Sequence, residues 1–157
     1  MEIKFFKNLP ESELRRIAEL HFAQWSPMNK SLNLANKSHE FTHEYAQHDD
    51  RLPMGMAAYI DGELAGFLRI KKTNLKKHPE LTPWIANLLV LPKFRGRAVA
   101  VALGKRAFNT LKSMGYEKAY FYSDVVNEKY KRIGFQLVGK VDKNDAGQAD
   151  LFVKHLN

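Results

Sequence analysis

The chain has 157 residues, 45% of them hydrophobic and 27% charged, and this composition excludes a disordered chain, a fibrous repeat and a miniature protein that depends on cross-links. The absence of cysteine excludes a disulfide framework, a cysteine nucleophile and metal sites built on thiolates. Because the chain starts with charged residues and has no apolar run of about 18 residues, we expect neither a signal peptide nor a membrane span. We therefore expect one cytoplasmic domain over residues 1–157.

The net charge of +8 is unevenly distributed along the chain. Residues 1–68 carry a net charge of −3, whereas residues 69–143 carry a net charge of +12. Such asymmetry is expected if a polyanion and a cationic second ligand bind to different parts of one fold. Chance clustering on solvated faces is the alternative that the charges alone leave open.

The first half of the chain predicts a strand, two helices and a hairpin. Residues 2–6 form a short predicted strand, and a helix is predicted to start after Pro10, where acidic residues occupy the first turn. A second, less regular helix is predicted over residues 31–48. Two apolar segments flank Asp61-Gly62, a dipeptide that adopts positive φ at low cost, so we predict a β-hairpin over residues 54–70.

The second half alternates strands and helices. The apolar segment at residues 84–91 lies between two prolines and predicts a strand buried on both faces. Apolar residues recur at steps of three and four from Ala98 to Met114, which predicts a long amphipathic helix. A strand, a short helix and two further strands are predicted at residues 118–123, 125–133, 135–141 and 149–156. The strand-helix-strand unit implies a parallel crossover in a mixed sheet, so the predicted fold class is α/β (α+β).

The segment PKFRGRAVAVAL, residues 92–103, lies between the buried strand and the long helix. Amides at a helix N-terminus, a glycine that permits close backbone approach and the guanidinium groups of Arg95 and Arg97 together favour binding of a phosphate or pyrophosphate. A solvated turn without a ligand is the alternative. The segment is neither a Walker loop nor a dinucleotide fingerprint.

These residues resemble a known family. The segment VLPKFRGRAVAVAL resembles the acetyl-coenzyme A signature of the GNAT N-acetyltransferase superfamily, Q/R-x-x-G-x-G/A, with Arg95, Ala98 and Ala100 at its defining positions. The run YSDVVNEKYKRIGF is similar to the segment before the sixth strand of that family, with Tyr130 four residues before Gly134. The resemblance implies a mixed, mostly antiparallel sheet of about seven strands, with a central parallel pair splayed around the cofactor and about four flanking helices.

The resemblance implies transfer of an acetyl group from acetyl-coenzyme A directly to a primary amine of a small molecule, peptide or protein. It implies no metal, no membrane and no nucleic acid as partners, and a possible homodimer. Backbone groups of Leu89, Val90 and Leu91 would pair with the pantetheine arm. The other implied cofactor-binding residues are Arg95, Gly96, Arg97, Ala98, Val99 and Ala100 for the pyrophosphate, and Ser123 and Asn127 beside the pantetheine. For Ser123 and Asn127, ordinary strand-end and helix-cap roles are the alternative.

By the same resemblance Tyr130 is the general acid that protonates the departing thiolate, with packing against the sheet as the alternative. Ala86 stands where some members carry a glutamate base, so the base is left open among Asn87 or another group through water, an acid such as Asp124 or Glu44, and solvent. Ala98 stands where the family has glycine, and we expect its methyl group to weaken cofactor binding. We expect Ala98→Gly to bind the cofactor more tightly but to lower stability slightly, since alanine is the better helix former.

Two further expectations concern the N-terminal part. Its negative charge predicts a cationic primary amine as acceptor. The motif His39-Glu40-Phe41-Thr42-His43 matches HExxH, so a zinc-dependent hydrolase is an alternative function. Asp49 stands where extended motifs have a third ligand, but Ala46 occupies the glycine position. A catalytically inactive coenzyme A or nucleic-acid binding domain is the remaining alternative.

Overall fold

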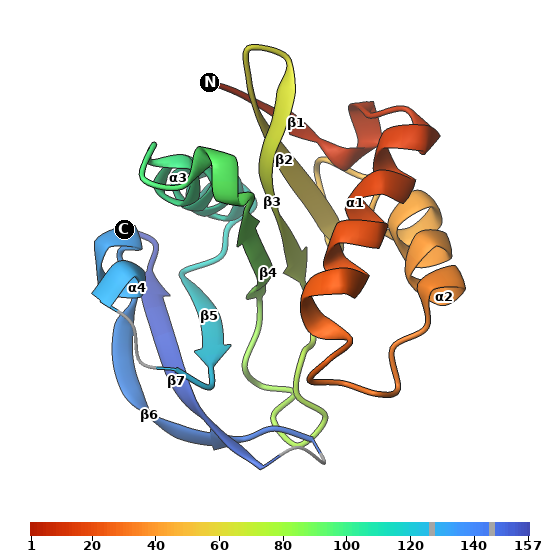
Figure 1. Cartoon of the computed structure of the whole chain (residues 1–157). Coiled ribbons are helices and arrows are strands. Elements are labelled where there is room, and N and C mark those ends of the chain that lie inside the picture. Colours follow the sequence, from red (N-terminus) through yellow and green to blue (C-terminus); the bar gives the residue numbers. More distant parts are fainter. Residues whose placement is uncertain (126–127, 145–146) are drawn as a thin grey trace.

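The computed structural model describes residues 1–125, 128–144 and 147–157. These residues form a sheet of seven strands in the order β1-β2-β3-β4-β5-β7-β6 (Figure 1). The strands are β1 (Glu2–Phe5), β2 (Met54–Ile60), β3 (Glu63–Lys71), β4 (Trp84–Val90), β5 (Lys118–Ser123), β6 (Gln136–Asp142) and β7 (Gln148–His155). The helices are α1 (Glu11–Trp25), α2 (Leu34–His39), α3 (Val99–Ser113) and α4 (Glu128–Ile133), with single 3-10 turns at Phe6–Asn8 and Pro92–Phe94. All neighbouring strands are antiparallel except β4 and β5, which are parallel. The predicted α/β (α+β) class, the order of strands and helices along the chain and the central parallel pair are confirmed.

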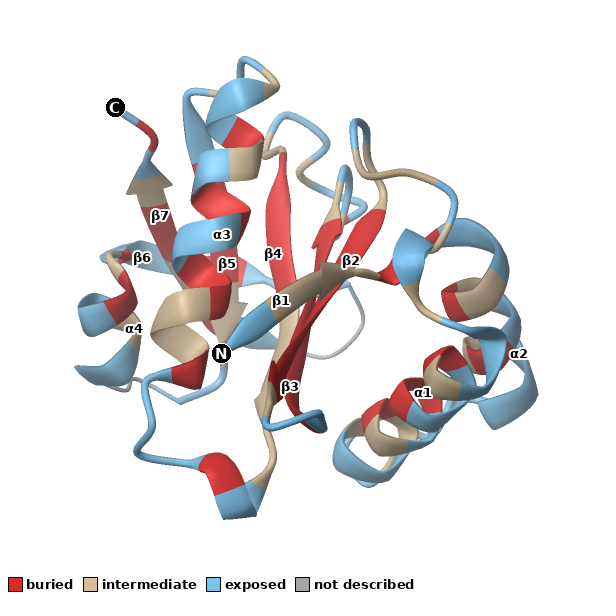
Figure 2. Ribbon diagram, turned by 90° about the horizontal axis from the view of Figure 1, so that it is seen from above, coloured by how far each residue is buried: buried red, intermediate tan, exposed pale blue. Residues whose placement is uncertain are grey.

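The sheet is covered on both faces. Helices α1 and α2 lie on one face and α3 lies on the other, and the buried strands β2, β3 and β4 run between these two layers (Figure 2). On the α3 face, Leu103 and Leu111 belong to one hydrophobic cluster with Leu68. On the α1 face, Ile17 and Phe67 belong to a second cluster. Strand β3 is therefore buried on both sides, because its alternate side chains enter different clusters.

The second predicted helix is shorter than the range of residues 31–48 that was expected for it. Asn33 caps α2 by accepting a hydrogen bond from the Asn36 amide at 3.0 Å, but α2 ends at His39 and a π-helical turn follows over Glu40–Glu44. The Tyr45 amide bonds to the Glu40 carbonyl at 3.1 Å, five residues back. Tyr45 and Phe41, which differ by four positions, are both buried in the cluster on this face.

The hairpin between β2 and β3 has the predicted turn. Asp61 and Gly62 have φ values of 51° and 78°, the conformation that this dipeptide favours. Among the described residues, no helix is long and apolar enough to cross a membrane.

Candidate active site

Strands β4 and β5 separate soon after they meet. Among the described residues, their parallel register joins them at one pair, Trp84 and Tyr120. On its other side β4 stays paired with β3 up to Val90, which lies opposite Gly66. The β5-facing edge of β4 beyond Trp84 therefore presents backbone amides and carbonyls without a strand partner in the described part of the chain. An extended, amide-containing ligand can add to such an edge as an extra strand.

A β-bulge interrupts β4 at the middle of this edge. The register passes from Phe67 opposite Leu89 to Arg69 opposite Ala86, so β4 contains one residue more than β3 here. Asn87 lies in the bulge and has a φ of 53°, a left-handed conformation that asparagine tolerates better than most residues. The bulge turns the Asn87 side chain toward Arg69, whose Nε donates to Asn87 Oδ1 at 2.9 Å.

The turn between β4 and α3 is exposed from Arg95 to Ala98. Gly96 has a φ of 77°, and a Cβ atom at this position would meet no atom within 4 Å, so the space above the turn is open. The first turn of α3 contains no acidic residue and its first amides lack helical partners, which together favour an anion. The structure thus brings the predicted residues Leu89, Val90, Leu91 and Arg95 to Ala100 into one continuous stretch.

The charged side chains of this turn have contacts within the protein. Arg95 Nε donates to the Val90 carbonyl at 3.2 Å, which occupies one of the two acceptor positions of that oxygen. Lys93 Nζ lies 2.7 Å from a Glu63 carboxylate oxygen. The Arg97 guanidinium carbon lies 5.6 Å from the centre of the Phe94 ring.

Ala98 is the N-cap of α3 and has a φ of 60°, so the expectation that alanine is favoured here as a helical residue rested on the wrong backbone conformation. A left-handed conformation costs alanine about 1 to 2 kcal/mol, which exceeds the roughly 0.5 to 1 kcal/mol of extra chain entropy that glycine loses. Ala98→Gly should therefore raise the free energy of unfolding by up to about 1 kcal/mol and tighten coenzyme A binding. Urea unfolding and calorimetric titration measure the two effects.

Ala100→Gly is the matched control for Ala98→Gly, because residue 100 lies inside the first turn of α3, where glycine costs helix propensity. It should destabilise the protein. Equal destabilisation by both glycine variants would show that the backbone at residue 98 imposes no strain on alanine.

Tyr130 and Ser123 lie close to each other on the β5 side of the gap between β4 and β5, which is called the split below. Ser123 Oγ, at the end of β5, is 3.4 Å from Tyr130 Oη on α4. The Tyr130 ring packs on Phe121 with ring centres 4.7 Å apart, and the residue is only partly buried. Ser123 Oγ also donates to the Val125 carbonyl at 2.9 Å, which is the strand-end role expected as its alternative. Asn127 lies outside the described residues.

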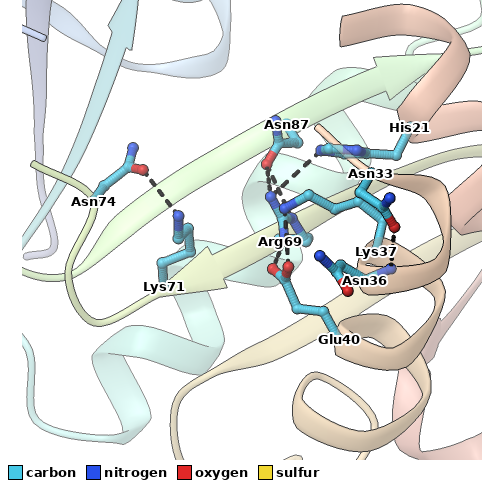
Figure 3. Close-up of polar contacts among 9 residues, drawn as sticks. All are labelled: His21, Asn33, Asn36, Lys37, Glu40, Arg69, Lys71, Asn74 and Asn87. Atoms are coloured by element: carbon cyan, nitrogen blue, oxygen red, sulfur yellow. Dashed lines mark hydrogen bonds and ion pairs between the residues drawn. The ribbon is translucent and has the colours of Figure 1, made fainter. Parts of the chain in front are cut away.

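A polar cluster that the sequence did not predict lies between α1, α2 and the sheet (Figure 3). Its centre is Arg69 on β3, of which 3% is exposed. The Arg69 guanidinium donates to Glu40 Oε1 at 2.5 Å and to Asn87 Oδ1 through both Nε and Nη2.

Other residues complete the cluster around this guanidinium. His21 Nε2 lies 3.4 Å from Arg69 Nη2, and Lys37 Nζ donates to Glu40 Oε2 at 2.9 Å. The aromatic rings of Phe41 and Tyr45 cover the guanidinium at 4.9 and 4.7 Å.

The charges of this cluster shift the pKa values of its members. Burial, with smaller contributions from Arg69 and Lys37, lowers the pKa of His21 to about 3, so its imidazole is neutral. Burial opposes ionisation of Glu40, but Arg69 and Lys37 outweigh it and hold the pKa of Glu40 below its ordinary value. Burial and Arg69 lower the pKa of Lys71 to about 8.

The acids expected to give the N-terminal part a negative surface are largely paired with cations. Glu40 is held by Arg69 and Lys37, and Asp49 Oδ1 lies 3.2 Å from Lys7 Nζ. The net charge of −3 already counts Lys7 and Lys37, so these pairs do not remove it, and a cationic acceptor stays a prediction.

The candidates for the general base have other partners or lie at the surface. Asn87 Oδ1 accepts from Arg69, and Asp124 Oδ1 lies 2.5 Å from Lys143 Nζ. Glu44 is exposed on the π-helical turn.

The HExxH motif spans the end of α2 and the π-helical turn. The His39 and His43 rings stack on each other with centres 4.1 Å apart, and both residues are exposed. Glu40 points instead to Arg69 on the sheet. In residues 1–125, 128–144 and 147–157, no group of three or more histidine, aspartate or glutamate side chains is arranged to hold a metal ion.

The model of the acetyltransferase (GNAT) family matches residues 14–135. The chain belongs to this family. It is accordingly an acyltransferase of the GNAT type, as the signature in the turn before α3 indicated. No curated protein sequence matches the chain significantly.

Solved GNAT structures share the fold over the whole chain. An aminoglycoside 6'-N-acetyltransferase complexed with coenzyme A superposes with a TM-score of 0.76 at 15% identity, over 100% of this chain and 98% of the other. The aminoglycoside 6'-N-acetyltransferase from Enterococcus faecium gives 0.73 at 14% identity, over 100% and 98%. A PaiA N-acetyltransferase from Thermoplasma acidophilum in complex with coenzyme A gives 0.61 at 16% identity, over 99% of each chain.

The sequence around Arg69 could have indicated the buried polar cluster. It is a charged residue within ELAGFLRI, a segment of strand length that is otherwise apolar after its first residue. A charge at a buried strand position requires a partner from elsewhere in the chain. Lys71, two residues later, lies on the same face of the strand.

Proposed function

We propose that this GNAT protein transfers the acetyl group of acetyl-coenzyme A directly to a primary amine. The observation that carries the proposal is that the residues expected to bind acetyl-coenzyme A, here called the donor side, lie in one continuous stretch from Leu89 to Ala100. The unpaired edge of β4 leads straight into the exposed turn before α3, where Gly96 leaves open space and the first helical amides are free. These residues fit coenzyme A, because its pantetheine arm contains amides and its pyrophosphate is an anion.

In this proposal the backbone of Leu89, Val90 and Leu91 aligns the pantetheine arm, and an amide near Val90 polarises the thioester carbonyl. The amine nitrogen attacks the carbonyl carbon, so that a C–N bond forms and the C–S bond breaks with its electron pair on sulfur. The Tyr130 hydroxyl gives its proton to that sulfur. Ser123 Oγ lies 3.4 Å from Tyr130 Oη and would stabilise the phenolate oxygen after its hydroxyl proton turns from the Val125 carbonyl toward Tyr130. Water accepts the proton that the amine loses, and the Tyr130 phenolate regains a proton from water before the next turnover.

Acetyl-coenzyme A should raise the melting temperature of the protein by mass action. At a concentration 100 times its Kd, a ligand that binds only the native state adds about 2.7 kcal/mol to the free energy of unfolding. A thermal scan over a concentration series measures the shift, and ADP at the same concentrations separates pyrophosphate binding from recognition of the pantetheine arm. No shift at millimolar acetyl-coenzyme A would contradict the proposed function.

The same proposal includes a cytoplasmic location, as the composition suggests, and a homodimer, as the resemblance implies. The absence of cysteine is consistent with a reducing compartment. The outermost strand β6 exposes Leu137 and Val138, which would be buried if two copies paired along this edge. Sedimentation velocity distinguishes a dimer from a monomer.

A further inference from the structure

Positive charge exceeds negative charge in the polar cluster between α1, α2 and the sheet (Figure 3). Arg69 is buried, and Lys37 and Lys71 are partly buried beside it. Glu40 is the carboxylate bound to the cluster's cations. His21 adds no charge at neutral pH, because its imidazole is deprotonated there.

Lys71 is the cation that this carboxylate does not neutralise. Glu40 divides its two carboxylate oxygens between Arg69 and Lys37. Lys71 Nζ donates to Asn74 Oδ1 at 3.0 Å, which is a neutral amide. Within the described part of the chain, no carboxylate lies within 4.0 Å of Lys71 Nζ. An ammonium group has three protons to donate, so this site retains capacity for an anionic partner.

The register places Lys71 beside the point where the donor strand opens. Lys71 and Arg69 alternate on β3 and so face the same side of the sheet, toward α1 and α2. Lys71 lies opposite Trp84, the residue of β4 that also pairs with Tyr120 of β5 before the two strands separate. Because neighbouring strands are about 4.8 Å apart, the Lys71 backbone is one strand away from the apex of the split.

We propose that the acceptor amine carries an anionic group, a carboxylate or a phosphate, which pairs with Lys71 while the amine is presented to the thioester at β4. This inference rests on the proposed function and specifies its substrate class. It gives the acceptor the opposite charge from the one that the acidic composition of residues 1–68 suggested. The reason is local: Glu40 is held by Arg69 and Lys37, whereas Lys71 has no carboxylate partner in the described residues.

Matched acceptors test the inference. The wild-type protein should acetylate ω-amino acids of three to six carbons with a kcat/KM at least 10-fold higher than that of the corresponding ω-amino amides. The amides keep the amine and the chain length but lose the negative charge. Aminoalkyl phosphates of the same lengths then show whether the preferred anion is a carboxylate or a phosphate.

Lys71→Met should reduce this preference to about one. Folding should tolerate the change, because burial and Arg69 disfavour the charged form of Lys71. Lys72→Met is the matched control, because it removes the same charge from an exposed neighbour and should keep the preference. The wild-type preference should also fall as the pH rises through about 8, where Lys71 loses its proton. Taking the ratio of two acceptors with the same amine cancels most of the titration of the amine itself.

A wild-type preference of one or less, or a preference that survives in Lys71→Met, would overturn the inference and leave the proposed function intact. If neither the ω-amino acids nor the amides are acetylated while another primary amine is, the inference is overturned and the proposed function stands; if no primary amine of any kind is acetylated, both are overturned.

Discussion

Tyr130→Phe is expected to lower kcat at least 10-fold with little change in the affinity for acetyl-coenzyme A. In the proposed mechanism the phenol protonates the departing sulfur, and general acids contribute roughly 10² to 10⁴ in rate. Phenylalanine keeps the ring, which packs on Phe121 and Phe152, so folding should be preserved. Steady-state kinetics with thiol detection, together with calorimetric titration of the cofactor, measure the two quantities.

Tyr116→Phe is the matched control for this variant. Tyr116 is partly buried at the end of α3, and its substitution removes the same hydroxyl from a different part of the protein. It should leave kcat unchanged. If Tyr130→Phe also turns over at the wild-type rate, Tyr130 serves packing alone.

Glu40→Gln is expected to lower the free energy of unfolding by about 3 kcal/mol, the lower end of the range for breaking a buried ion pair. Arg69 is 3% exposed and would lose its carboxylate partner while it stays charged. The pKa of Glu40 is lowered in the fold, so its stabilising effect is complete above about pH 4.5 and is lost as the pH falls through the lower, folded-state pKa. Urea unfolding at pH 7 and below pH 4 measures both effects.

Glu44→Gln removes the same charge from an exposed site on the same π-helical turn and should cost much less. Adding Arg69→Met to Glu40→Gln should recover part of the lost stability, because the unpaired cation is then gone. A Glu40→Gln variant as stable as Glu44→Gln would show that the ion pair contributes nothing to the fold.

Local patterns were sufficient to predict the strands and the long helix. Asp61-Gly62 positioned the hairpin, and the spacing of apolar residues before Gly115 defined α3. The π-helical turn at Glu40–Glu44 was not predictable in this way, because it depends on packing of Phe41 and Tyr45 against the sheet. The positive φ of Ala98 was missed because a sequence pattern reports residue type rather than the backbone angle at the N-cap.

The two sides of the candidate site differ in how far the sequence can predict them. The residues proposed to bind the pantetheine arm and the pyrophosphate are contiguous from Leu89 to Ala100, so a single motif places them together. The polar cluster joins His21, Glu40 and Arg69 from three elements far apart in the chain. Only the pairing of β3 with β4 and the docking of α1 and α2 bring these side chains into contact, and no local spacing encodes that arrangement.

Incubation of the protein with acetyl-coenzyme A and a panel of primary amines tests the central claim most directly. Free thiol is followed by colour, and the acetylated amine is identified by mass spectrometry. We predict thiol release that depends on the amine and equals the amount of acetylated product, and that falls at least 10-fold in Tyr130→Phe. Binding of acetyl-coenzyme A without release of thiol by any amine would contradict the account and indicate a non-catalytic coenzyme A binding domain.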